Sequence, residues 1–198
     1  MLFRSDYIED KIRPSVLVEA KADLLIYGMA ENAVLETAKR LASGEKIQHL
    51  TDIKGTAYRL LKDMEIAGDC VRLPGLEKQR QNPNTFLEAH VEYGKFARPG
   101  GRCVIQEQNG IDIVVNPPAK PLDADQMDRV YSLGFTRRSH PRYDEKGGIS
   151  ALEPVKYSIT THRGCFGGCS FCSIYFHQGG QISSRSIESI LSEADRFL

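Results

Sequence analysis

Three cysteines near the end of the sequence have a spacing that suits iron–sulfur chemistry. Cys165, Cys169 and Cys172 follow the pattern C-x3-C-x2-C within one glycine-rich stretch, residues 164–172, which we call the cysteine loop. Thiolates are soft ligands that hold iron–sulfur clusters. Glycine lets a backbone curl around such a cluster and turn its N–H groups toward the sulfides. The spacing therefore indicates a cluster site.

The number of cysteines narrows the chemistry further. A cluster that only transfers electrons is usually held by four cysteines, and no fourth cysteine lies near these three in the sequence. Three ligands leave one iron with an open coordination position. Because an open position on a metal is where substrate chemistry takes place, the pattern favours a catalytic cluster.

Two alternative sites would use the same cysteines. A structural zinc site would add His162 or His177 as a fourth ligand, although paired C-x2-C motifs are its more usual signature. An electron-transfer module would need Cys70 or Cys103 to fold back onto the loop as the fourth thiolate. Outside these alternatives, Cys70 and Cys103 are expected to be ordinary thiols that pack like small apolar side chains.

A strand and a helix are predicted to hold the cysteine loop. Residues 155–160 alternate apolar and polar side chains, which predicts a strand that runs into the loop. A helix is predicted over 186–197, with a buried face made of Ile187, Ile190, Leu191, Ala194 and Phe197. The order strand, loop, helix predicts a β/α unit. Residues 135–150, which are polar and lack apolar periodicity, are predicted to be a linker.

Residues 1–134 are predicted to form a Rossmann-like or mixed α/β region. The apolar run at 22–27 predicts a strand, and the amphipathic segment 31–42, closed by Gly44, predicts a helix. Residues 47–53 are expected to supply the returning strand of a βαβ unit.

Further elements of this region have local signals. A strand is predicted over 54–61 and a helix over 85–96. The Asn-Gly pair at 109–110, between two β-rich runs, predicts a hairpin. Asp123 is predicted to cap a short helix that follows it.

The composition gives no sign of a charged partner. The 26 basic and 26 acidic side chains cancel, so neither a nucleic acid nor a membrane partner is supported. No apolar run reaches the roughly 18 residues that suggest a membrane-spanning helix, and the sequence does not begin with a secretory signal. We therefore expect a cytoplasmic protein, in a compartment where thiols stay reduced.

The cysteine loop resembles the signature of a known superfamily. With Phe171 in the aromatic position, it is similar to the radical S-adenosylmethionine motif C-x3-C-x-aromatic-C. Neighbouring segments extend the likeness to the YgiQ-like family of radical S-adenosylmethionine proteins. These segments are 157–159, 163–172, 177–179 and 182–186, and further upstream 22–28, 134–137 and 140–141 also look similar.

The resemblance implies a cofactor and a reaction type. Cys165, Cys169 and Cys172 would hold a [4Fe-4S] cluster whose open iron binds the amino and carboxylate groups of S-adenosylmethionine, with Phe171 as a further S-adenosylmethionine contact. Reduction by an electron donor such as flavodoxin or ferredoxin would split S-adenosylmethionine and give a 5′-deoxyadenosyl radical, which takes a hydrogen from the substrate. The resemblance does not identify the substrate.

The resemblance also implies a barrel that extends beyond this sequence. Residues 151–198 would form the start of a partial (β/α) barrel, after the N-terminal α/β region. The Gly-Gly-Glu segment that would meet the amino group of S-adenosylmethionine does not occur in the sequence, and neither does the Asp-x-His-x-x-Gly of a cobalamin site. We therefore expect a piece of a longer protein that does not catalyse by itself.

Overall fold

The computed structural model describes residues 4–197, which pack as two compact units. The first unit extends to Lys120 and the second begins at Pro121. Residues 1–3 and 198, at the outer ends of the first and last predicted segments, lie outside the described residues. The segment boundaries at 134 and 150 stay predictions.

A mixed five-stranded sheet is the framework of the first unit. Its strand order is β3-β4-β7-β6-β5, and of these neighbours only β5 and β6 run parallel. The strands are β3 (Leu24–Ile26), β4 (Thr56–Leu60), β5 (Cys70–Arg72), β6 (Cys103–Gln108) and β7 (Ile111–Val115). The mixed α/β class predicted for this region is therefore confirmed.

The predicted βαβ unit does not form. Helix α2 spans Glu31–Ala42, as predicted, and the Gly44 N–H donates to the Leu41 carbonyl just after it. The expected return strand over 47–53 is wrong, because a 3-10 helix occupies Ile47–His49 and the next strand, β4, pairs antiparallel with β3. Leu50 and Ile53 are buried in a small cluster with Ala33 of α2, so this segment packs on the helix instead of joining the sheet.

Other predictions for the first unit are confirmed. β6 and β7 form the predicted hairpin, and its two turn residues have the positive φ values (53° and 78°) that a type I′ turn requires. β4 and α4 (Pro83–Phe96) lie where a strand and a helix were predicted. The remaining elements are the hairpin of β1 (Arg4–Asp6) and β2 (Lys11–Arg13), and the helices α1 (Val16–Glu19) and α3 (Leu76–Gln81).

The core of the first unit is the sheet with its short covering segments. Its largest buried cluster consists of Leu17, Ala57, Leu73, Val104, Ile113 and Val115. Two buried glutamines of β6 form a chain of hydrogen bonds within the first unit. The Gln108 side chain accepts the Ser15 N–H at the start of α1 and donates to Gln106, which donates to the Pro74 carbonyl. These bonds satisfy groups that would otherwise be buried without partners.

Cys70 and Cys103 are partners in the sheet. They face each other in the parallel pair β5–β6, with Cα atoms 4.4 Å apart, and their sulfurs form a disulfide. The expectation of two independent thiols is therefore wrong. The two cysteines are separated by 33 residues, and only the strand order brings them together. While bonded to each other, neither is a free thiolate for the cysteine loop.

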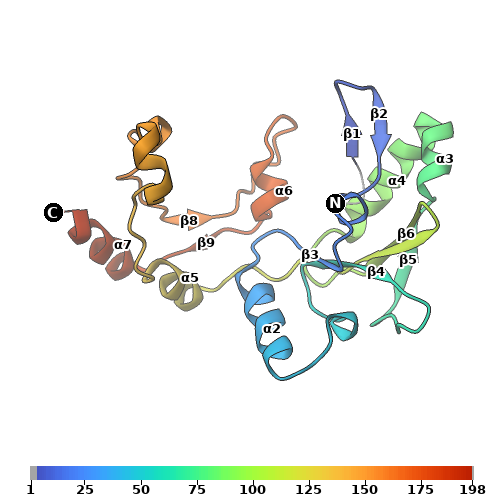
Figure 1. Cartoon of the computed structure of the whole chain (residues 1–198), viewed down its shortest axis with the longest axis horizontal. Helices are drawn as coiled ribbons and strands as arrows, with labels where there is room; N and C mark the ends of the chain where they lie inside the picture. The colour runs from blue at the N-terminus through green and yellow to red at the C-terminus, as the bar shows by residue number, and fades with distance from the viewer. Residues whose placement is uncertain (1–3, 198) are drawn as a thin grey trace. The chain divides into compact units, whose positions relative to one another are not determined.

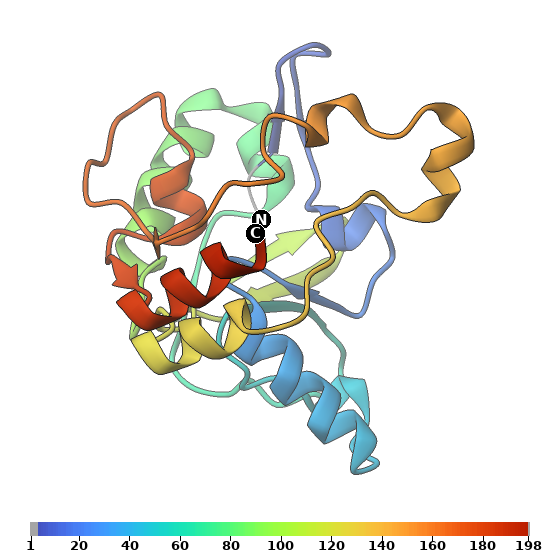
Figure 2. The same cartoon turned by 90° about the vertical axis from the view of Figure 1, so that its left-hand side faces the viewer.

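The second unit pairs two helices with a short strand ladder. Helices α5 (Ala124–Tyr131) and α7 (Ile187–Ala194) lie side by side (Figures 1 and 2). Strand β8 (His162–Arg163) pairs antiparallel with β9 (Ser183–Ser184), and α6 (Ile174–Gln178) lies between them in the sequence. The predicted cap of α5 is confirmed, since Asp123 and Gln126 form a reciprocal capping box.

Two predictions for the second unit are wrong. Residues 155–157 form a turn and residues 158–160 have no regular secondary structure, so the predicted strand does not form. The Lys156 and Ser158 carbonyls accept hydrogen bonds from Arg137, and the Ser158 N–H is engaged within the turn, so these groups do not build a ladder. In α7, Ile187 and Leu191 of the predicted buried face are exposed, Ile190 and Ala194 are half-buried, and the buried side chain is Glu193.

The order strand, cysteine loop, helix is present around β8, α6 and α7. The ladder at β8 is antiparallel, and no parallel strand pair occurs among the described residues of this unit. Within residues 4–197, no helix has both the length and the apolar character needed to cross a membrane.

Candidate metal centre

The cysteine loop leaves the end of β8 and leads into α6. All three of its cysteines are free; Cys169 is exposed, and Cys165 and Cys172 are half-buried. A Cβ atom at Gly167 would lie 3.4 Å from the Cys165 sulfur and 3.5 Å from the Cys169 sulfur. The two sulfurs therefore flank Gly167, and their separation is at most the sum of these distances.

Gly167 also supplies a hydrogen-bond donor. Its N–H donates to the Cys165 sulfur, with the nitrogen 3.4 Å away. A donor of this kind stabilises the negative charge of a thiolate ligand. Three free thiols on one loop, with an amide directed at one of them, fit the donor set of an iron–sulfur cluster.

Cys172 follows within one turn of Cys169. The Cys172 N–H donates to the Cys169 carbonyl over 3.0 Å, and Gly168 before them has a positive φ of 57°. Within residues 4–197, no three His, Cys, Asp or Glu side chains lie close enough together to form a metal-binding group. The structure thus places the Cys165 and Cys169 sulfurs around one glycine but does not bring the third sulfur to them.

The two ends of the cysteine loop are tied together at its base. The Gly164 N–H donates to the Gln178 side-chain oxygen, and the Cys165 N–H donates to the Gly179 carbonyl, each over 3.0 Å. Gly164 has a φ of 88°, and a Cβ atom at this position would overlap the Gln181 carbonyl oxygen. Only glycine fits here. The base therefore fixes the backbone position of Cys165.

Gln178 is a functional candidate that the sequence did not reveal. Glutamine is a common residue and no motif marks this one; only the fold shows that its side chain accepts a hydrogen bond from Gly164 at the start of the loop. The glycine pattern could have marked Gly164, since glycine is enriched where a backbone approaches another closely.

Two aromatic side chains of the loop are almost completely exposed. Phe171, the residue implied as a contact to S-adenosylmethionine, is 90% exposed, and Phe166 is 81% exposed. The loop therefore presents two large apolar side chains next to its three cysteines.

The chain matches the family model described as Radical SAM N-terminal over residues 2–158. It belongs to that family. The match covers more than half of the chain and ends before the cysteine loop.

Relatives extend the similarity through the loop. The chain is 40% identical over 191 residues to a UPF0313 protein of Clostridium botulinum (strain ATCC 19397 / Type A), which covers 96% of this chain and 30% of the relative. A UPF0313 protein of Methanocella arvoryzae is 44% identical over 189 residues, which is 95% of this chain and 31% of the relative. A UPF0313 protein of Clostridium perfringens (strain 13 / Type A) is 41% identical over 193 residues, which is 97% of this chain and 29% of the relative.

The chain thus spans about three-tenths of the length of these relatives. No solved structure matches it. The resemblance to the YgiQ-like radical S-adenosylmethionine proteins is confirmed by the family model and these relatives.

In this radical S-adenosylmethionine family member, the histidines of the zinc alternative do not gather with the cysteines. His162 lies exposed on β8, where its ring Nδ1 is hydrogen-bonded to the Thr161 hydroxyl over 3.0 Å. His177 is exposed on α6. In the described part of the chain neither belongs to a group of three potential ligands.

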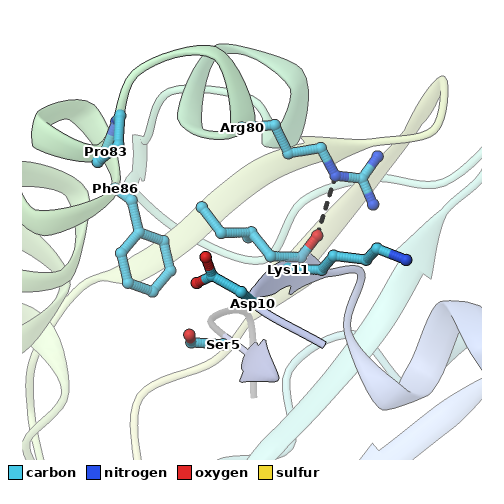
Figure 3. Close-up of a pocket in the computed structure, with 7 residues that line it drawn as sticks. Ser5, Asp10, Lys11, Arg80, Pro83 and Phe86 are labelled. Carbon is cyan, nitrogen blue, oxygen red and sulfur yellow. Dashed lines mark hydrogen bonds between the residues drawn. The ribbon is translucent and has the colours of Figure 1, made fainter. Parts of the chain in front are cut away.

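A separate groove lies in the first unit of the radical S-adenosylmethionine N-terminal domain. It has a volume of about 540 Å³ and lies beside the β1–β2 hairpin, α3 and α4 (Figure 3). Arg80 borders it, but donates to the Ile12 carbonyl and pairs with Glu77. Lys11 pairs with Glu9. These cations are engaged within the protein, so we assign the groove no ligand.

Proposed function

We propose that Cys165, Cys169 and Cys172 hold a [4Fe-4S] cluster that works with S-adenosylmethionine in radical chemistry. One observation carries the proposal: a member of the radical S-adenosylmethionine family presents three free cysteines on one glycine-rich loop, with two sulfurs flanking Gly167. The chemistry that the bound group supplies is reductive cleavage of S-adenosylmethionine.

The side chains and backbone of the loop have separate tasks in this proposal. The three thiolates bind iron and leave one coordination position open for S-adenosylmethionine. The Gly167 N–H stabilises the charge on the Cys165 thiolate. The tied base of the loop keeps the Cys165 backbone in place, and Phe171 contributes apolar surface that excludes water once it is covered.

The activity proposed here belongs to a protein of the relatives' length, of which this chain spans about three-tenths. Its further partners are a substrate of unknown identity and an electron donor such as flavodoxin or ferredoxin. We infer a cytoplasmic location, because a reducing compartment keeps the three cysteines of the loop available as thiolates, although the Cys70–Cys103 disulfide is of a kind that is rare in such a compartment.

Anaerobic reconstitution with iron and sulfide tests the proposal. The parent chain is expected to bind about four irons and to give a cluster EPR signal after reduction, which changes when S-adenosylmethionine is added. Replacing Cys165, Cys169 or Cys172 by alanine should abolish the signal. Cys70→Ala is the matched control, because this cysteine lies outside the loop, and its iron uptake should equal that of the parent.

Other results would decide against the proposal. If the triple alanine variant binds as much iron as the parent, the assignment is wrong. Zinc retained through purification, with no cluster signal after reconstitution, would favour the structural zinc site. Loss of the signal in Cys70→Ala would favour a four-ligand electron-transfer cluster.

A further inference from the structure

The start of the cysteine loop is attached to helix α5 through one side-chain pair. Arg163 is the last residue of β8 and directly precedes Gly164. Its Nε donates to the Tyr131 hydroxyl over 3.1 Å, and its guanidinium carbon lies 5.3 Å from the centre of the Tyr131 ring. Tyr131 is the last residue of α5. The hydrogen bond and the ring contact therefore hold the Arg163 side chain, next to the loop, against Tyr131 of α5.

The strand that pairs with β8 is held by the same tyrosine. Arg185 follows β9 directly, is only 6% exposed, and places its guanidinium carbon 4.4 Å from the centre of the Tyr131 ring. Its N–H donates to the Thr161 carbonyl and its guanidinium to the Thr160 carbonyl, just before β8. Tyr131 thus contacts Arg163 of β8 and Arg185, the residue just after β9, at the base of the loop.

A buried carboxylate completes the attachment. Glu193 of α7 is 5% exposed and pairs with both Arg185 and Arg137. Arg185 donates in addition to the Ser189 carbonyl of α7 over 2.8 Å. Because the buried Glu193 balances the buried guanidinium, Arg185 is fixed against α7, and the Tyr131 ring packs against a rigid cation.

Arg163 has the features of a positioning group. Its Nε is directed to Tyr131, and the guanidinium stacks on that ring. Along the chain, Arg163 is followed by Gly164 and Cys165, whose N–H groups make the bonds at the base of the loop. A displacement of Arg163 moves these two residues, because Arg163 is joined to Gly164, whose backbone lies close against that of Gln181.

We propose that Tyr131 and Arg163 are positioning residues for the cluster, which act by fixing where Gly164 and Cys165 lie. The inference rests on the proposed function of the loop. It goes beyond the three cysteines by assigning the presentation of the Cys165 thiolate to a hydroxyl on α5. Neither residue touches the iron in this scheme.

The test compares Tyr131→Phe with a matched control. Tyr131→Phe removes only the hydroxyl and keeps the ring on which both arginines stack. Tyr143→Phe is the control, because the Tyr143 hydroxyl also accepts a hydrogen bond from an arginine, Arg142. The guanidinium carbon of Arg142 lies 4.7 Å from the centre of the Tyr143 ring, and neither residue belongs to the cysteine loop. Both variants are made in the full chain.

Amide hydrogen exchange of the iron-free chain is the first readout. In Tyr131→Phe, exchange at the Gly164 and Cys165 amides should be faster by on the order of tenfold, the effect of losing one hydrogen bond to a charged group. Exchange at the amides of α7 should not change. Tyr143→Phe should exchange like the parent at all of these positions.

Release of iron to a chelator after reconstitution is the second readout. Tyr131→Phe should lose iron several-fold faster than the parent and give a broadened EPR signal, while Tyr143→Phe should match the parent. The proposal is overturned if Gly164 and Cys165 exchange at the parental rate, or if exchange accelerates equally across α7, which would show a purely structural role. A parent chain that takes up no iron defeats the proposed function instead, and the exchange data still decide whether Tyr131 positions the loop.

Discussion

Substitution of Gly164 by alanine should separate two costs at the base of the cysteine loop. Gly164 has a φ of 88°, and an added Cβ atom would overlap the Gln181 carbonyl oxygen and lie 2.8 Å from its carbonyl carbon. Gly168 in the same loop also has a positive φ, 57°, but a Cβ atom there would meet nothing within 4 Å. Gly168→Ala is therefore the matched control for backbone strain without a clash.

The magnitudes follow from these contacts. Both alanines should pay about 1–2 kcal/mol for the left-handed conformation. Only Gly164→Ala also has to move the Gln181 backbone. Because Gln181 is separated from β9 by Ile182 alone, relief of the clash should open the β8–β9 ladder. Overpacking of this kind costs a further amount of about 1–3 kcal/mol. That difference corresponds to roughly a fivefold to more than a hundredfold loss in the population with a closed loop base.

Chelator competition on the reconstituted chain measures this difference. Gly164→Ala should release its iron at a lower chelator concentration than Gly168→Ala, and the exchange protection of the Cys165 amide should fall in Gly164→Ala alone. Thermal unfolding of both variants checks that the rest of the chain is intact. If the two variants retain iron equally and protect Cys165 equally, the tied base does not govern the loop, and the reasoning from Gly164 fails.

Three further outcomes are expected. Glu193→Ala should destabilise the chain by about 3–5 kcal/mol in urea unfolding, because it leaves buried arginine charge without its carboxylate; a loss below about 1 kcal/mol would contradict this. Hydrogen bonds from Ser186, chiefly from its side chain, lower the pKa of Asp128 below its ordinary 3.8, so NMR titration of Ser186→Ala should show a higher value. The stabilisation from Asp128 is present above its ordinary pKa of 3.8 and is lost as the pH falls through the lowered pKa; an unchanged pKa would refute the assignment. Breaking the disulfide with Cys103→Ser should lower stability but leave iron uptake by the loop unchanged, and a loss of iron would restore the four-ligand alternative.

Elements with local signals could be predicted from the sequence. The Asn-Gly hairpin, the helix over 31–42 and the capping box at Asp123 each depend on a few neighbouring residues, and all three form as predicted. The strand predicted over 155–160 failed because its carbonyls bond to Arg137, a contact 19 and 21 residues apart in sequence. Alternation of apolar side chains carries no information about such a competitor.

The candidate site also has features that the sequence alone could predict and features that required the fold. Cysteine spacing is a local signal, so the loop could be found without a fold. The pairing of Cys70 with Cys103 depends on the strand order, and the roles of Tyr131 and Gln178 depend on which side chains the fold brings to the loop. Their residue types are common, and their neighbours in sequence carry no metal ligands. Residues that act on the loop from other elements can be identified only once the fold is known.

The attachment at the base makes the three cysteines inequivalent. Cys165 is held by its own N–H bond to Gly179 and by the Arg163–Tyr131 pair just before it. The bonds at Cys169 and Cys172 stay within the loop, since the Cys172 N–H donates to the Cys169 carbonyl. Gathering the third sulfur therefore requires rearrangement within the loop, while Cys165 stays at the tied base. Because ligand binding that orders a segment contributes to its stability, iron should protect the amides of Cys169 and Cys172 from exchange more than that of Cys165. Equal protection of all three amides would show that the base offers no pre-organised first ligand.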